Sequence, residues 1–154
     1  MTLAPQTLSL NVLHAHLEAI AREMAAQLLL AVDESGNVIE AIGEQVGPSA
    51  PTLAALGAAN LAATHEISRL AGLEAKTQSP QTLLIEGKLG AVILVEGAHG
   101  LNFIAVLSPK SIIGLARLEM RDLALIAWSP ADPNQLEQPI DIAAELLDKL
   151  DIDF

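Results

Sequence analysis

The sequence contains no cysteine and no tyrosine, and only two phenylalanines and one tryptophan occur among its 154 residues. Without cysteine, a disulfide scaffold and a thiol nucleophile are both excluded. No apolar run approaches the roughly 18 to 20 residues that a membrane-spanning helix needs. The N-terminus also lacks the basic cluster and apolar run of a signal peptide. We therefore expect a cytoplasmic protein with a core of Ala, Leu, Ile and Val.

Basic residues are also few, because eight Lys and Arg oppose nineteen Asp and Glu, for a net charge of -11. More than half of this charge lies in residues 132–154, which hold seven acidic residues against Lys149 alone. Phosphate backbones and anionic lipid surfaces bind proteins through clustered Lys and Arg. We therefore expect neither nucleic acid nor a membrane as a partner.

Motifs for chemistry are missing as well. The sequence has no G-x-x-x-x-G-K-S/T phosphate loop and no G-x-S-x-G nucleophile turn. His14 and His16 are two residues apart, so they point to different sides of a helix and cannot form an i, i+4 metal pair. We interpret His65 and His99 as ordinary polar residues. The sequence thus predicts no catalytic residue, no metal site and no cofactor.

Hydrophobic periodicity and turn residues predict eight elements in the order α-β-β-α-β-β-β-α. The helices are expected at 9–26, from 51 or 52 to 71, and from about 111 to 128; the strands at 28–32, 38–43, 82–86, 91–96 and 101–107. Several strands are apolar on consecutive residues, which is typical of a sheet covered on both faces. The short connections favour a five-stranded, mostly antiparallel sheet in a three-layer α/β/α sandwich.

Each helix has apolar residues that we expect to face the sheet. In the first helix they are Leu10, Leu13, Leu17, Ile20 and Met24. In the second they are Leu53, Leu56, Ala63, Ile67 and Leu70, with Asn60 either as a buried amide that needs hydrogen-bond partners or as a polar contact at an interface. In the third they are Ile112, Leu115, Leu118, Leu123 and Ile126.

The opposite side of the second helix is unusual because it is small and uncharged. It holds Ala55, Ala58, Ala59 and Ala62, with His65, Glu66 and Arg69 only at the C-terminal end. Small residues let helices approach closely, so this side is expected to pack on the same helix of a second copy in a two-fold dimer. The alternative is an alanine-rich helix that simply tolerates solvent.

Together these elements make residues 8–128 resemble the Roadblock domain family. The resemblance is carried by the hairpin 32–39, the alanine-rich helix 53–72, the strand triplet and the helix opening Ile-Gly-Leu-Ala-Arg-Leu at 113–118. It implies a Roadblock/profilin-like fold and a homodimer whose second helices pair. It also implies that strand 82–86, with Leu83 and Ile85, joins the two sheets.

Length and an acidic C-terminal helix make the chain most similar to the MglB type within this family. That similarity implies a non-enzymatic regulator of a small Ras-like GTPase of the MglA type, which accelerates GTP hydrolysis by remodelling the GTPase switch regions. The alternative is a scaffold that binds a GTPase or motor complex without changing turnover. His65, Glu66 and Arg69 are our candidate partner-binding residues. Arg69, Arg117 and Arg121 are the candidates for an arginine finger. Arg117 and Arg121 are the weaker of these, because we expect them to form solvated ion pairs with Glu119 and Asp122.

Residues 129–154 form a separate segment in the sequence pattern. A linker that contains Pro130 and Pro133 precedes a predicted amphipathic acidic helix. Its apolar docking stripe consists of Ile140, Ala143, Leu147, Leu150 and Phe154. This helix is expected either to dock in a groove or on a basic partner surface, or to pack permanently on its own domain.

Overall fold

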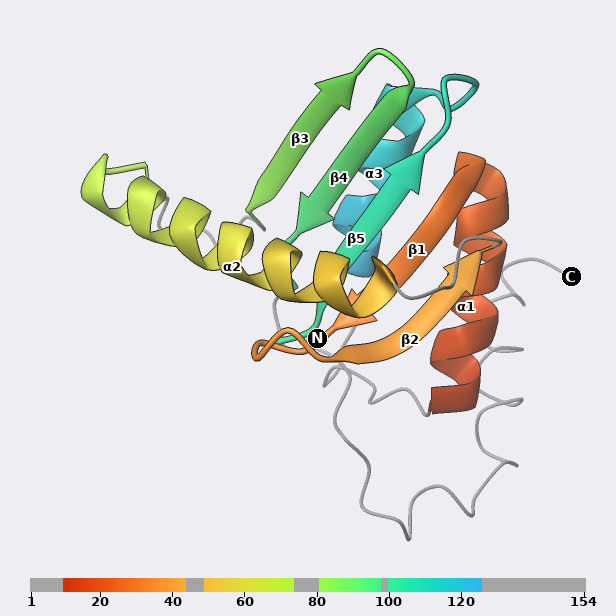
Figure 1. Cartoon of the computed structure of the whole chain (residues 1–154), viewed down its shortest axis with the longest axis horizontal. Coiled ribbons are helices and arrows are strands. Elements are labelled where there is room, and N and C mark those ends of the chain that lie inside the picture. Colours follow the sequence, from red (N-terminus) through yellow and green to blue (C-terminus); the bar gives the residue numbers. More distant parts are fainter. Residues whose placement is uncertain (1–9, 44–48, 74–80, 98–99, 126–154) are drawn as a thin grey trace, which may run out of the picture.

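A five-stranded antiparallel sheet with helices on both faces organises the protein (Figure 1). The structure, a computed structural model, describes residues 10–43, 49–73, 81–97 and 100–125. Its elements are α1 (Leu10–Met24), β1 (Ala26–Val32), β2 (Val38–Gly43), α2 (Ser49–Leu70), β3 (Thr82–Gly87), β4 (Gly90–Val95), β5 (Asn102–Leu107) and α3 (Ile113–Leu123). The predicted α/β/α sandwich and the predicted order of elements are confirmed.

The strands lie in the order β2-β1-β5-β4-β3, so β2 and β3 are the two edges of the sheet. Strands β3, β4 and β5 form the predicted meander, and β5 then pairs with β1, where Leu30 lies opposite Ile104. The central strands are buried on consecutive residues because helices cover them on both sides.

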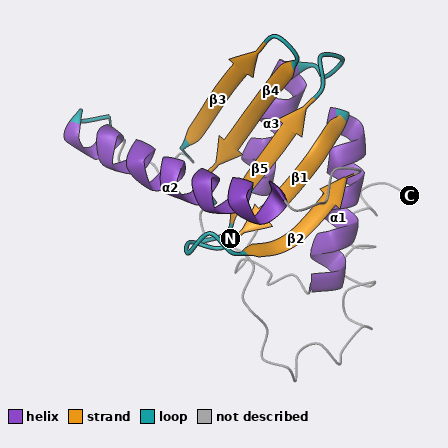
Figure 2. Ribbon diagram, viewed as in Figure 1, coloured by secondary structure: helices purple, strands orange, loops and turns teal. Residues whose placement is uncertain are grey.

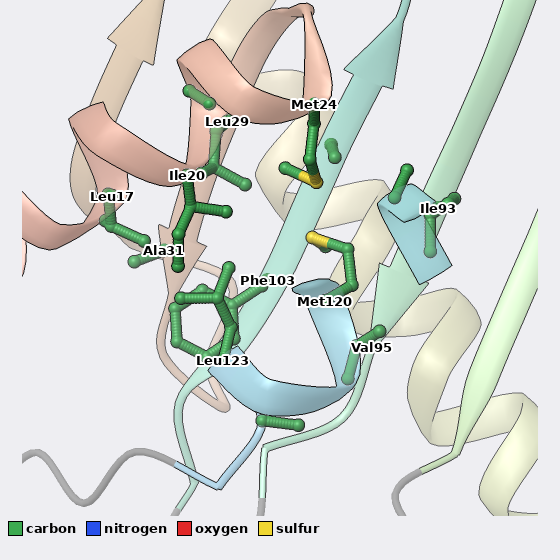
Figure 3. Packing of buried hydrophobic residues seen from close by; sticks show 14 of the residues in the cluster. Leu17, Ile20, Met24, Leu29, Ala31, Ile93, Val95, Phe103, Met120 and Leu123 are labelled. Atoms are coloured by element: carbon green, nitrogen blue, oxygen red, sulfur yellow. The ribbon is translucent and has the colours of Figure 1, made fainter. Parts of the chain in front are cut away.

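Helices α1 and α3 cover one face of the sheet (Figure 2). In α1 the buried residues are Leu13, Leu17, Ile20, Ala21 and Met24, at the spacing of one helical stripe. Figure 3 shows Met24 of α1 and Met120 of α3 pointing toward one another over the sheet. Phe103 of β5 is fully buried in the same cluster, so one of the few aromatic residues stands at its centre.

Helix α2 lies on the other face, and its contact side consists mostly of small residues. Ala50, Ala54, Gly57, Ala58 and Leu61 are buried there. A Cβ atom added to Gly57 would lie 2.2 Å from Cδ1 of Ile104. The helix backbone therefore approaches the sheet more closely than any larger residue at position 57 would allow.

This packing overturns the predicted orientation of the second helix. Of the residues expected on the sheet, only Leu53 is partly buried against it, whereas Leu56, Asn60, Ala63, Ile67 and Leu70 are exposed. Ala58 was expected on the outer side and is buried instead. The expectation was wrong because it assigned the large apolar residues to the core, whereas the close approach at Gly57 selects the small ones.

The orientation predicted for the third helix is also wrong. Leu123 is buried as expected, but Ile112, Leu115 and Leu118 are exposed. The residues that face the core are Ala116, Met120, Leu123 and Ala124. Ile126 lies outside the described residues, and so does the end of the helix that was predicted near residue 128.

Candidate protein-binding surface

The outer side of α2 carries a continuous apolar stripe. It consists of Leu56, Ala59, Ala63, Ile67 and Leu70, all exposed and spaced by three or four residues. Leu56, Ile67 and Leu70 are 59, 64 and 72 % exposed. Isolated exposed leucines are common on protein surfaces, but an aligned row of them marks an interaction site. We call these five residues the α2 stripe.

The C-terminal half of α2 extends past the β3 edge of the sheet (Figure 1). It is held there by two polar contacts to the ends of strands. The Ser68 hydroxyl donates a 3.0 Å hydrogen bond to the Gln81 side chain just before β3. His65 Nδ1 lies 3.6 Å from a carboxylate oxygen of Glu96, just after β4. Ser68 is buried, and no pattern in the sequence indicates its role.

Strand β3 forms the sheet edge beneath this part of α2. Among the described residues it pairs with β4 alone, which leaves the backbone groups of its outer side available to another strand. Leu83 is partly buried and Ile85 is 48 % exposed, both on the face that α2 covers. The opposite edge, β2, packs against both α1 and α2, so β3 is the less covered edge. The α2 stripe and the β3 edge together form the candidate binding surface.

A hollow of about 240 Å³ lies near the β3–β4 turn, lined by Glu86, Lys88, Ser108 and Ser111 among others. It is smaller than the roughly 300 to 1,000 Å³ typical of small-molecule sites. The Ser111 hydroxyl donates a 3.0 Å hydrogen bond to the Ala25 carbonyl at the end of α1, which gives it a structural role. This hollow is therefore a poor candidate for a small-molecule site.

The sequence matches no protein-family model and no curated protein. Solved structures do match. MglB of Myxococcus xanthus superposes with a TM-score of 0.65 at 20% identity, over 79% of this chain and 89% of that one. A structure described as MglB with tetrameric arrangement superposes with a TM-score of 0.66 at 25% identity, over 79% of this chain and 92% of that one. The Roadblock/LC7 domain from Streptomyces avermitilis superposes with a TM-score of 0.62 at 13% identity, over 77% of this chain and 92% of that one. The chain has the fold of a Roadblock-type domain. The resemblance noted in the sequence is confirmed, including its similarity to MglB.

In this Roadblock-type fold, the predicted interface residues divide into two groups. Ala55, Ala59 and Ala62 are exposed on α2, as expected, and Leu83 and Ile85 lie on the edge strand. Ala58 is buried against the sheet of its own domain, so it is withdrawn as an interface residue. Leu56, Ile67 and Leu70 of the α2 stripe are exposed on the outer side of the helix. The buried-amide interpretation of Asn60 is likewise excluded, because Asn60 is exposed.

The three candidate partner-binding residues lie close together at the C-terminal end of α2. Arg69 Nε donates a 3.0 Å hydrogen bond to Glu66, and this contact holds the pKa of the Glu66 carboxyl below its usual value. His65 contacts Glu96 as described above. The result is an exposed polar cluster beside the apolar stripe.

The remaining candidates lie elsewhere. Arg117 and Arg121 are on α3, across the sheet from α2, and among the described residues neither forms an ion pair with Glu119 or Asp122. His14 Nδ1 contacts a Glu40 carboxylate oxygen at 3.1 Å. Within the described ranges, no group of three or more His, Asp or Glu could hold a metal ion, and no helix is long and apolar enough to cross a bilayer. His99 and the tail stripe lie outside the described residues.

Proposed function

We propose that this Roadblock-type protein is a homodimeric, non-catalytic regulator of a small Ras-like GTPase of the MglA type. The observation that carries the proposal is the α2 stripe beside the uncovered β3 edge. A row of large apolar side chains in water is unfavourable by roughly 25 cal/mol for each Å² exposed, so a partner that covers it gains that energy. The similarity to solved MglB structures supports a small GTPase as the class of partner.

In the proposed dimer, two copies meet about a two-fold axis. The β3 strands pair antiparallel, which satisfies the outer backbone groups of both edges and extends the sheet from one copy to the other. The α2 helices then lie side by side. The small residues Ala59 and Ala63, which lie between Leu56 and Ile67 along the stripe, let the two helices approach closely. The patch is self-complementary, as a closed two-fold interface requires.

The paired α2 helices would form a platform for the GTPase, with His65, Glu66 and Arg69 at its border. Regulation then follows from differential binding: a surface that binds one arrangement of the GTPase switch regions more tightly increases the population of that arrangement. The side chain of Arg69 is hydrogen-bonded to Glu66, which favours a role in docking over one as an arginine finger.

The test is phosphate release by an MglA-type GTPase from the same genome, measured with and without a twofold excess of this protein. We expect acceleration by the wild type and a much weaker effect of Arg69→Glu. Arg22→Glu is the matched control, since Arg22 is exposed on α1 across the sheet.

Three results would count against parts of this proposal. Binding without acceleration would leave only the scaffold function. Equal effects of Arg69→Glu and Arg22→Glu would remove the GTPase from the α2 face. The absence of any binding would contradict the proposed partner.

A further inference from the structure

A second apolar surface lies across the sheet from the α2 stripe, on the outer side of α3. Leu115, Leu118 and Leu125 follow one another at helical spacing, opposite the buried Ala116 and Met120. Leu118 and Leu125 are more than half exposed, and Leu115 more than a third. Helix α3 is therefore apolar on both sides, and one side lacks cover among the described residues.

Both signs of charge lie on α3, where Arg117 and Arg121 are accompanied by Glu119 and Asp122. Lys110, Arg117 and Arg121 are three of only eight basic residues in a chain of net charge -11. Glu119, the acidic residue between the two arginines, lies near Glu23 of α1 and, among the described residues, forms no ion pair with either arginine. Burial and the neighbouring Glu23 and Asp122 raise the pKa of Glu119. The arginines thus remain available to other carboxylates.

The chain itself offers a complementary segment. The described residues end at Leu125, directly after α3, and 29 residues follow. Their sequence combines an apolar stripe with a strong excess of acid, which suits an apolar helix face that also carries Arg117 and Arg121. We propose that residues 139–154 of the tail dock along the outer side of α3, with Leu147 and Leu150 against Leu115 and Leu118.

The linker has the length that this docking requires. Ten residues, 129–138, separate the end of the predicted third helix from the tail helix and can span about 33 Å when extended. An 11-residue helix such as α3 is about 17 Å long, so the linker reaches back to its first turn. Tethering also gives the tail an effective concentration on the order of millimolar at its own α3.

Charge favours the tail over a second copy as the occupant. A symmetric contact between two α3 helices would place Arg117 and Arg121 close to the same arginines of the other copy. The tail instead brings Asp148, Asp151 and Asp153, whose negative charge is unfavourable at the end of their own helix. Contact with the α3 arginines gives these carboxylates a favourable partner.

The lack of cysteine makes a direct test possible, because one introduced thiol is the only one in the chain. Asp122→Cys places it between Leu118 and Leu125 without removing an apolar residue. In the full chain we expect this thiol to react with a soluble reagent about tenfold more slowly when the tail has Leu147 than when it carries Leu147→Glu. A tenfold difference corresponds to a tail that is docked about nine-tenths of the time. Ile142→Glu, the same change off the docking stripe, should leave the thiol protected.

Two controls complete the design. Leu89→Cys, in the exposed β3–β4 turn, should react at the same rapid rate with either tail. High salt should speed the reaction at position 122, since it screens the contact between carboxylates and arginines. A position-122 thiol that reacts equally in wild-type and Leu147→Glu tails overturns the proposal. Protection that is unchanged in Leu147→Glu but is lost on dilution also overturns the proposal, because a second copy would then cover this side of α3.

Discussion

Replacing Gly57 with alanine would place a methyl group where Ile104 now lies. The added Cβ would be 2.2 Å from Cδ1 of Ile104, 3.1 Å from its Cγ1 and 3.3 Å from a methyl carbon of Leu94. Ile104 is fully buried in β5, so it has little room to move. Alanine gains about 1 kcal/mol of helix propensity over glycine, whereas overpacking a core costs about 1 to 3 kcal/mol. We therefore expect a net loss of up to about 2 kcal/mol in the free energy of unfolding.

A double-mutant cycle separates this clash from other effects. Ile104→Val alone should lose about 0.5 to 1.5 kcal/mol because it leaves a small cavity. In the Gly57→Ala background the same change removes the clashing methyl group, so the double variant should be at least as stable as Ile104→Val. The assay is urea unfolding followed by far-UV circular dichroism. One protomer concentration is used throughout, because association would add to the apparent stability.

The result that refutes this reasoning is additivity. If the two single losses sum to the double loss within about 0.5 kcal/mol, then positions 57 and 104 do not touch. In that case α2 would not present its small residues to the sheet. The assignment of Leu56, Ile67 and Leu70 to the outer surface would fail with it.

Two further predictions concern single residues. Ala25 ends α1 with φ of 52°, in the left-handed region that favours glycine, so Ala25→Gly should raise the free energy of unfolding by about 1 kcal/mol in the same urea assay. No change would show that position 25 does not hold that conformation. The raised pKa of Glu119 means that its contribution to stability decreases as pH rises from about 4.5 through the folded-state pKa. Glu119→Gln should therefore raise the urea midpoint at pH 7 more than at pH 4.5, and an equal gain at both would contradict the raised pKa.

The order of elements could be predicted from the sequence because apolar runs, glycine turns and short connections leave few alternatives. The mostly antiparallel pairing follows the same economy, whereas the edge position of β3 was implied only by the resemblance to Roadblock domains. The buried side of α1 was also largely predictable, since its large apolar residues fall on a single stripe.

The orientations of α2 and α3 were missed because both helices are apolar on two sides. Periodicity alone cannot decide which side meets the sheet in such a helix. In α2 the informative residue was Gly57, because glycine inside a helix is unfavourable unless a close approach requires it. In α3 the core side is built from Ala116, Met120 and Ala124, and leucines elsewhere on the helix concealed it.

The predicted surface is therefore larger than the alanines alone suggested. Ala58 is buried in the core, whereas Leu56, Ile67 and Leu70 lie on the outer side of α2. An outer face of alanines alone is compatible with solvent, whereas an aligned row of leucine and isoleucine is unfavourable there. The correction in orientation thus supports the proposed dimer more strongly than the original interpretation did.

The most direct test of the central claim is the mass of the protein in solution, measured by sedimentation equilibrium. The wild type should have twice the 16.1 kDa mass of one chain. Ala63→Glu, in the middle of the α2 stripe, should have the mass of a single chain, whereas Ala19→Glu, exposed on α1, should remain a dimer. A wild type that stays at 16.1 kDa at high concentration, or an Ala63→Glu variant that still dimerises, would contradict the claim that a second copy covers the α2 stripe.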